Sequence, residues 1–183
     1  MKQIIAATKP ITLYWTTGKV ADAGKNMETI VRGGGGGGYT YNGTGSTAPV
    51  TITSTTVVHD QIFLVDRDGR EHAFQLQGFN VACRTDNQLS IIWAIREGKK
   101  TGPYIIAYNH STRNAFYNDA SLNKLFRYPV YYLLGAMLAC LLLGRISGLF
   151  YALFLAAPIV WLLLARQQAK RFKNSLDFSE FDR

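Results

Sequence analysis

Three histidines and two cysteines are the side chains of this 183-residue chain that most readily bind a metal or act as nucleophiles. His59, His72 and His110 fall in separate parts of a β-rich region, where they could meet Cys83. Their positions lack the regular ligand spacing of a zinc site. Scattered histidines of this kind are usually structural, so we expect no metal, no cofactor and no catalytic residue. The sequence favours a protein that is not an enzyme.

Cys83 could serve as a nucleophile if a cation lowered the pKa of its thiol. Arg84 is adjacent in sequence, but neighbours along a strand point to opposite faces. We therefore interpret Cys83 as a small buried hydrophobic residue. Cys140 lies inside an apolar segment, which makes a disulfide with Cys83 implausible, and two unpaired cysteines fit a reducing compartment.

A short basic loop is the next group of residues that could bind a ligand. Its members combine cations with an aromatic ring, as single-strand nucleic-acid-binding barrels do. Glu97 dilutes the charge, and short charge runs usually serve solubility, so nucleic acid is disfavoured. We predict a partner-binding loop made of Arg96, Lys99, Lys100 and Tyr104.

The segment 128–165 contains one full charge, Arg145, whereas residues 1–127 hold fourteen Lys or Arg and nine Asp or Glu. As helices, 128–144 and 146–165 would measure roughly 25 and 30 Å, about one bilayer core each. Buried helices of a soluble protein would normally keep a polar face, which both stretches lack. The sequence therefore predicts a two-helix transmembrane hairpin.

Basic residues border this hairpin and set its expected orientation. The positive-inside rule places both termini in the cytoplasm, with Arg145 in the outer turn of a multi-pass inner-membrane protein. The apolar N-terminus is interrupted by Lys9 and Pro10, so we expect no cleavable signal peptide. The same cations would form a basic collar that contacts anionic lipid. The collar comprises Lys124, Arg127, Arg166, Lys170, Arg171 and Lys173.

Short alternating or β-branched runs between residues 50 and 118 predict strands with turns about every ten residues. Asp66 to Gly69 has the composition of a tight hairpin turn. Residues 18–32 could be a strand or a short helix, and we favour a strand because Gly24 and the β-branched residues disfavour a helix. The pattern resembles a mainly β, small antiparallel barrel of the SH3-like or OB-like type.

The glycine-rich segment 33–49 predicts a mobile loop between two strands. A phosphate-binding loop would need a Lys followed by Ser or Thr, which the segment lacks. The chain is thus divided into a series of expected regions. These are an N-terminal extension (1–17), a cytoplasmic barrel-like domain (18–118), a linker (119–127), the hairpin (128–165) and a basic, then acidic, cytoplasmic tail (166–183).

The expected function is that of an inner-membrane protein whose cytoplasmic β domain binds a protein partner or assembles a complex. Small residues four apart, such as Gly135 and Ala139, also allow a homo-oligomer. Three alternatives stay open. They are a membrane-tethered nucleic-acid-binding barrel, a small transport or channel subunit, and a membrane-bound enzyme or processing factor.

Overall fold

The computed structural model describes residues 2–6, 9–41, 44–47 and 49–182. The strands in this part of the chain are β1 (Lys2–Ala6), β2 (Lys9–Gly34), β3 (Gly38–Tyr41), β4 (Thr44–Thr47), β5 (Thr51–Val65), β6 (Glu71–Gln77), β7 (Gln88–Arg96), β8 (Tyr104–Asn109) and β9 (Asn114–Tyr117). The helices are α1 (Asp119–Leu125), α2 (Val130–Leu143), α3 (Leu149–Asn174) and the 3₁₀ helix η1 (Phe178–Asp182).

Seven strands form one antiparallel sheet in the order β6-β5-β2-β7-β8-β9, with β1 also paired to β2. The end strands β6 and β9 do not pair with each other, so the sheet is open and the prediction of a small closed barrel is wrong. The reason lies in the 26-residue strand β2. It pairs with β7 over Ile11–Lys19 and with β5 over Lys19–Gly34, and its second half leaves the domain instead of curling back.

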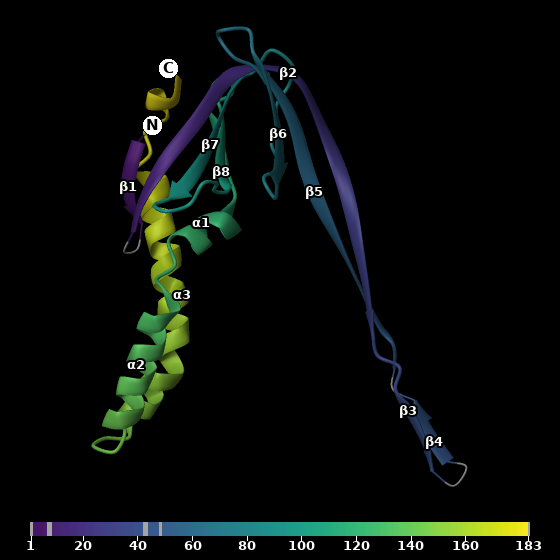
Figure 1. Cartoon of the computed structure of the whole chain (residues 1–183), viewed down its shortest axis with the longest axis vertical. Coiled ribbons are helices and arrows are strands. Elements are labelled where there is room, and N and C mark those ends of the chain that lie inside the picture. Colours follow the sequence, from purple (N-terminus) through teal and green to yellow (C-terminus); the bar gives the residue numbers. More distant parts are fainter. Residues whose placement is uncertain (1, 7–8, 42–43, 48, 183) are drawn as a thin grey trace.

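The strand predicted for residues 18–32 is confirmed as part of β2. The segment 1–17, expected to precede the domain, contains β1 and the first half of β2. The glycine-rich segment expected as a loop contains the short ribbon of β3 and β4 at the far end of β2 and β5 (Figure 1). Residues 42–43 and 48 of that segment lie outside the described residues.

The core consists of two clusters on opposite faces of β7, because its alternate side chains point to opposite sides. Ile92 and Ala94 face a cluster shared with the helices, and Leu89 and Ile91 face a cluster shared with β5 and β6. The first cluster is completed by Ile11, Leu13, Ile105, Ile106, Leu122, Leu125, Phe126, Ala169, Phe172 and Phe181. The second is completed by Val20, Ile62, Leu64, Phe74, Leu76, Phe79, Val81 and Ala107.

The C-terminal end of the chain is part of this core. Ala169 and Phe172 on the last turns of α3 are buried, and Phe181 of η1 is fully buried. The carbonyl oxygen of Phe181 accepts hydrogen bonds from Thr17 (2.5 Å) and Ser90 (2.9 Å). The acidic, aromatic end of the tail is therefore a structural element that closes one face of the sheet.

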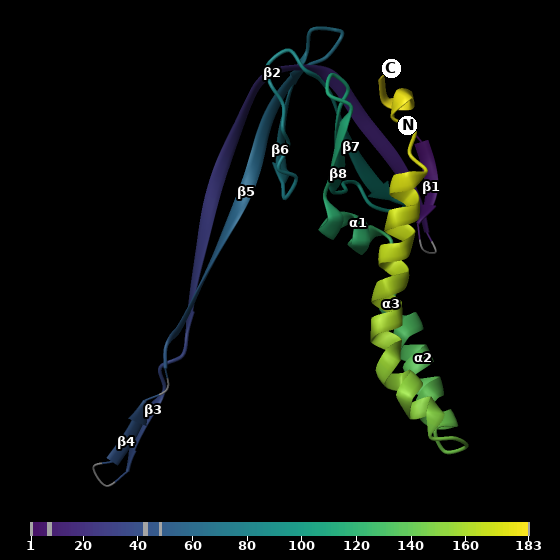
Figure 2. The same ribbon diagram turned by 180° about the vertical axis from the view of Figure 1, so that it is seen from behind.

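Helix α3 is long and apolar enough to cross a membrane, and only 6% of its most apolar 18-residue stretch is buried. Helix α2 has 14 residues and lies beside α3 (Figures 1 and 2). None of its side chains is buried. It reaches the length of a span only together with α1, and those two helices meet at a bend of 63°. The fold thus contains one helix that qualifies as a span by itself.

The hairpin turn predicted at Asp66 to Gly69 is confirmed between β5 and β6. The Asp66 carboxylate accepts hydrogen bonds from the backbone N–H groups of Asp68 and Arg70, both at 2.9 Å. Gly69 has a φ of +77°, which glycine adopts without steric cost. The turn is thereby fixed by the residue types that predicted it.

Candidate functional site

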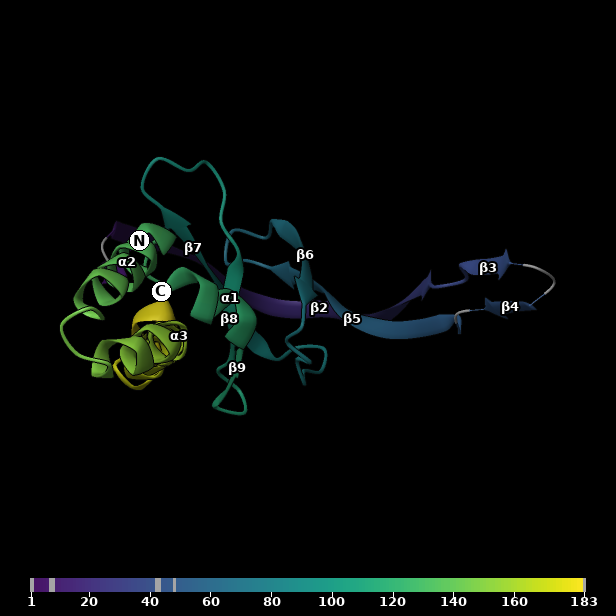
Figure 3. The same cartoon turned by 90° about the horizontal axis from the view of Figure 1, so that it is seen from below.

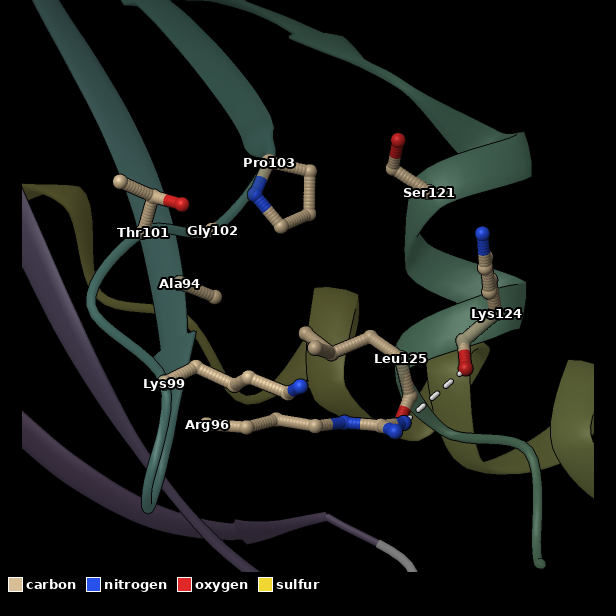
Figure 4. A pocket seen from close by; sticks show the side chains of 9 residues that line it. All are labelled: Ala94, Arg96, Lys99, Thr101, Gly102, Pro103, Ser121, Lys124 and Leu125. Carbon is tan, nitrogen blue, oxygen red and sulfur yellow. Dashed lines mark hydrogen bonds between the residues drawn. The ribbon is translucent and has the colours of Figure 1, made fainter.

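A groove of about 330 Å³ lies between the β7–β8 loop and helix α1 (Figure 4). Arg96 and Lys99 extend into it from the strand side, while Ser121 and Lys124 stand on α1. The remaining lining residues are Ala94, Thr101, Gly102, Pro103 and Leu125. We call this feature the basic groove.

Arg96 fixes the loop to the helix. Its Nη2 donates hydrogen bonds to the carbonyl oxygens of Lys124 (3.1 Å) and Leu125 (2.5 Å). These carbonyls belong to the last turn of α1, where helix carbonyls lack intrahelical partners. Helix α1 is held in place by Asn118, whose side chain accepts a hydrogen bond from the Ser121 N–H, and by buried Leu122. The position of Lys124 opposite Lys99 therefore follows from ordinary capping and packing.

The loop is pressed against β7 at Gly102. A Cβ atom at Gly102 would lie 1.8 Å from the carbonyl oxygen of Ala94, so no other residue fits there without moving the backbone. The lining contains three cations and no carboxylate among the described residues. The basic groove thus has the electrostatics of an anion-binding site with partly apolar walls.

The residues of the predicted partner-binding loop are separated by the fold. Arg96 and Lys99 line the basic groove, and Lys100 is not among its lining residues. The Tyr104 ring packs edge-on against Phe74 (5.8 Å between centroids) and Trp93 (6.2 Å). Because the Tyr104 ring packs against Phe74 and Trp93, it does not line the basic groove with Arg96 and Lys99.

The residues of the predicted collar follow three different arrangements. Lys124 joins the basic groove, and Lys173 pairs with Asp119 and lies 4.4 Å from the Tyr117 ring centroid. The Arg127 guanidinium lies over the Trp161 ring, 5.0 Å from its centroid, close to the start of α2. The remaining three, Arg166, Lys170 and Arg171, are exposed on the part of α3 that follows its apolar segment.

A second candidate surface is the arm, which we define as residues 26–34 of β2 with residues 51–58 of β5. It projects beyond β6, away from the helices (Figures 1 and 3). Directly opposed residues of an antiparallel pair share a face. One face carries Met27, Thr29, Val31, Ile52, Ser54, Thr56 and Val58, with no charged residue.

This uncharged face continues the buried face of the sheet. The pairing of β2 with β5 has no irregularity beyond Asp22, so Met27 and Val31 lie on the same side as Ala23 and Ile62. Between the core and the arm, this side carries the ion pair of Lys25 with Asp60, at 4.0 Å. Ile62 is buried, whereas Met27 is 73% exposed and Val31 is 63% exposed. The surface that forms the core in the domain is therefore uncovered along the arm.

The other face of the arm is charged. Glu28 and Arg32 lie there, and His59 contacts the Glu28 carboxylate at 3.4 Å. Within the described residues no third strand pairs with either side of the arm. Its outer backbone edges are therefore available to another strand.

The chemically reactive side chains do not gather. The Nε2 of His72 bonds the Asp66 carboxylate (2.9 Å), and that of His110 bonds the Ser90 hydroxyl (2.7 Å). Across the described part of the chain, no group of three or more His, Cys, Asp or Glu side chains could hold a metal ion. Burial, followed by the nearby Asp60 charge, raises the pKa of the Cys83 thiol, which opposes thiolate formation.

The sequence predictions missed Thr101 and Ser121 in the basic groove and the whole uncharged face. Every second residue in each arm strand is uncharged, and this pattern could have indicated the uncharged face. It does so only once the register of the two strands is known. The fold and these sites define a mainly antiparallel, open-sheet protein with one candidate membrane helix. Comparisons with known protein families, with curated proteins and with solved structures give no match.

Proposed function

We propose that this chain is an integral inner-membrane protein that assembles a protein complex through the uncharged face of its arm. In this proposal α2 and α3 both cross the bilayer as a hairpin, and the β domain and both termini lie in the cytoplasm. The observation that carries the function is the exposed, charge-free face of the arm, which lies on the same side of β2 and β5 as the core, beyond the pair of Lys25 and Asp60.

Side-chain exposure supports the membrane part of the proposal. Leu134 and Leu138 of α2 and Leu155 and Ile159 of α3 are each 59–73% exposed. Such a contiguous apolar surface marks a membrane or protein contact, and its lack of charge favours lipid. Basic residues at the domain end of the helices, against Arg145 alone in the turn, support the cytoplasmic orientation.

The direction of the arm favours a protein, rather than lipid, as its binding partner. The arm and the helices diverge from each other, but both extend downward from the domain in Figures 1 and 2. An arm that keeps this direction reaches toward the membrane, where free backbone edges and the charges of Glu28 and Arg32 are costly among lipid tails. A protein surface satisfies both the edges and the charges.

The size of the arm favours a different protein over a second copy. Nine residues at about 3.3 Å each give a ribbon about 30 Å long and about 10 Å wide. One face then offers roughly 300 Å², well below the roughly 800 Å² per partner of a stable interface. A partner that covers the uncharged face and also pairs with the outer backbone edges would bury more surface and leave the charged face open.

Cysteine labelling in native membranes tests this proposal. Single cysteines replace Val31 or Ile52 on the uncharged face and Arg32 or Thr53 on the charged face, in a chain carrying Cys83→Ala and Cys140→Ala. A polar maleimide is applied to opened membrane vesicles and to detergent-purified chain. We expect cysteines at positions 31 and 52 to react with the maleimide several-fold more slowly in membranes than in detergent. Cysteines at positions 32 and 53 should react equally in both preparations.

Equal labelling of the two faces in membranes would refute the arm as the binding surface. Protection of all four positions would indicate that the arm is fully enclosed, which also contradicts a face-specific contact. Crosslinking from position 27 then gives the mass of the covering protein. A product of twice the chain's own mass would replace the proposed partner with a second copy.

A further inference from the structure

The basic groove brings together charges that the sequence keeps apart. Arg96 and Lys124 are 28 residues apart, and Lys99 reaches the same groove from the β7–β8 loop. We propose that the basic groove binds a phosphate group, and that this group is the headgroup of an anionic phospholipid. The inference rests on the membrane location in the proposed function but concerns a different surface from the arm.

The donors of the groove suit a phosphate. Arg96 uses Nη2 for the carbonyl oxygens of α1 and keeps the other N–H groups of its guanidinium for a ligand. Lys99 and Lys124 add two point charges from opposite walls, and Thr101 and Ser121 add hydroxyls. A phosphate with several acceptor oxygens can bond to both walls at once.

The nearby carboxylates do not neutralise these cations. Asp119, on the same helix as Lys124, is paired with Lys173 on α3. Glu97 lies in the loop but is not among the residues that line the groove. The positive charge is therefore concentrated in the groove, and an anion restores the balance.

Position and shape favour a lipid as the source of the phosphate. Leu125 lines the groove at the end of α1, five residues before Val130 begins the exposed apolar surface of α2. A headgroup in the groove would thus lie at the level where the apolar surface begins. Ala94, Pro103 and Leu125 form apolar walls that suit glycerol and the first acyl carbons, which free phosphate lacks.

Native mass spectrometry of the full chain in a neutral detergent tests the proposal. Dioleoyl phosphatidylglycerol is titrated against dioleoyl phosphatidylcholine, and inorganic phosphate is the soluble competitor. We expect one tightly held phosphatidylglycerol. The double variant Lys99→Gln/Lys124→Gln should weaken its binding about tenfold or more, since each basic residue near anionic lipid contributes about fivefold in affinity.

The matched control is Lys19→Gln/Arg84→Gln, which removes the same charge from exposed positions outside the basic groove and the predicted collar. We expect the control to change phosphatidylglycerol binding less than twofold. Equal losses in the two double variants would overturn the groove as the site. Equal binding of phosphatidylcholine, or displacement of the lipid by an equal concentration of inorganic phosphate, would overturn the anionic lipid as its ligand.

Two further measurements separate this proposal from the proposed function. Lys99 and Lys124 are exposed, so the groove variant should keep a melting temperature close to that of the wild type, as exposed substitutions usually do. It should also stay in the membrane fraction, because α2 and α3 are unchanged. A wild-type chain found in the supernatant would refute the membrane location. If the groove variant stays in the membrane and loses phosphatidylglycerol binding, the result supports the groove as the lipid site and leaves the membrane location unaffected.

Discussion

Two projections leave the folded domain (Figures 1 and 3), and both carry exposed apolar side chains outside the core. On α2 and on the first part of α3 the exposed surface is apolar on every side, and most backbone groups between the helix ends bond within each helix. On the arm one face lacks charge, the opposite face carries Glu28 and Arg32 beside Ile30 and Val57, and the outer backbone edges are unpaired within the described residues.

This difference indicates two different surroundings. Lipid tails accept a surface without polar groups but offer nothing to an open backbone edge. A protein surface accepts an amphipathic ribbon, since it can add a strand to the edge and cover the apolar face. A free two-stranded ribbon is marginally stable in water, so the arm in particular gains from a partner.

The largest expected effect concerns the helical projection. Leu155→Arg combined with Ile159→Arg places two charges on the exposed part of α3, at a cost of about 2.5–3.5 kcal/mol each in mid-bilayer. We expect this chain to lose its resistance to alkaline extraction from membranes. The control, Gln167→Arg with Asn174→Arg, alters exposed positions beyond the apolar segment and should remain membrane-bound. Unchanged extraction of the first variant would contradict insertion of α3.

The next effect separates the two halves of β2. A Cβ atom at Gly18 would lie 2.5 Å from the Val65 carbonyl oxygen, where β2 exchanges its partner β7 for β5. Gly18→Ala should therefore destabilise the domain by about 1–3 kcal/mol, as overpacking does. Gly33→Ala, in the arm and with nothing within 4 Å of its Cβ, should change stability by about 0.5 kcal/mol or less.

Chemical denaturation of the full chain in detergent measures both glycine variants. Similar losses for the two would mean that β2 is packed alike along its length, contrary to the contrast between core and arm. A loss confined to Gly18→Ala would place the structural constraint at the strand crossover.

A third effect concerns the two faces of the arm. Val31→Asp puts a charge on the uncharged face, and Thr53→Asp puts one on the opposite face. With a photocrosslinker at position 27, we expect Val31→Asp to lower the yield of the crosslinked complex in membranes about tenfold. Thr53→Asp should lower it less than twofold. Because both positions are exposed, neither variant should shift the melting of the domain. Equal yields would remove the distinction between the faces.

Local signals in the sequence predicted the elements well, since the Asp66 turn and the strand at 18–32 are both confirmed. Closure of the sheet was predicted wrongly, because strand count and turn spacing do not reveal that one strand changes partners midway. The basic groove depends on packing of α1 beside the β7–β8 loop, which spacing cannot reveal. Arg96 and Lys124 therefore appeared in separate predictions, as a loop and as a collar.

The smallest effect concerns the turn between β5 and β6, at the opposite end of β5 from the arm. The hydrogen bond from His72, with that from the Arg70 backbone, lowers the pKa of Asp66 from 3.8 to about 2. A depressed carboxyl pKa stabilises the folded turn above about pH 4, and this contribution is lost as the pH falls toward 2. The amides of Asp68 and Arg70, which donate to Asp66, should then lose hydrogen-exchange protection across that range.

The matched variant for this measurement is Asp66→Asn, whose amide does not titrate. Its exchange at Asp68 and Arg70 should lack the extra pH dependence between 4 and 2, because no proton is taken up at position 66. The arm includes the first half of β5, the strand that leads into this turn. The uncharged face of the arm contains no titrating group. Protection along Val31 and Ile52 should therefore not follow the Asp66 titration. A parallel loss of protection there would show that the turn and the arm unfold as one unit.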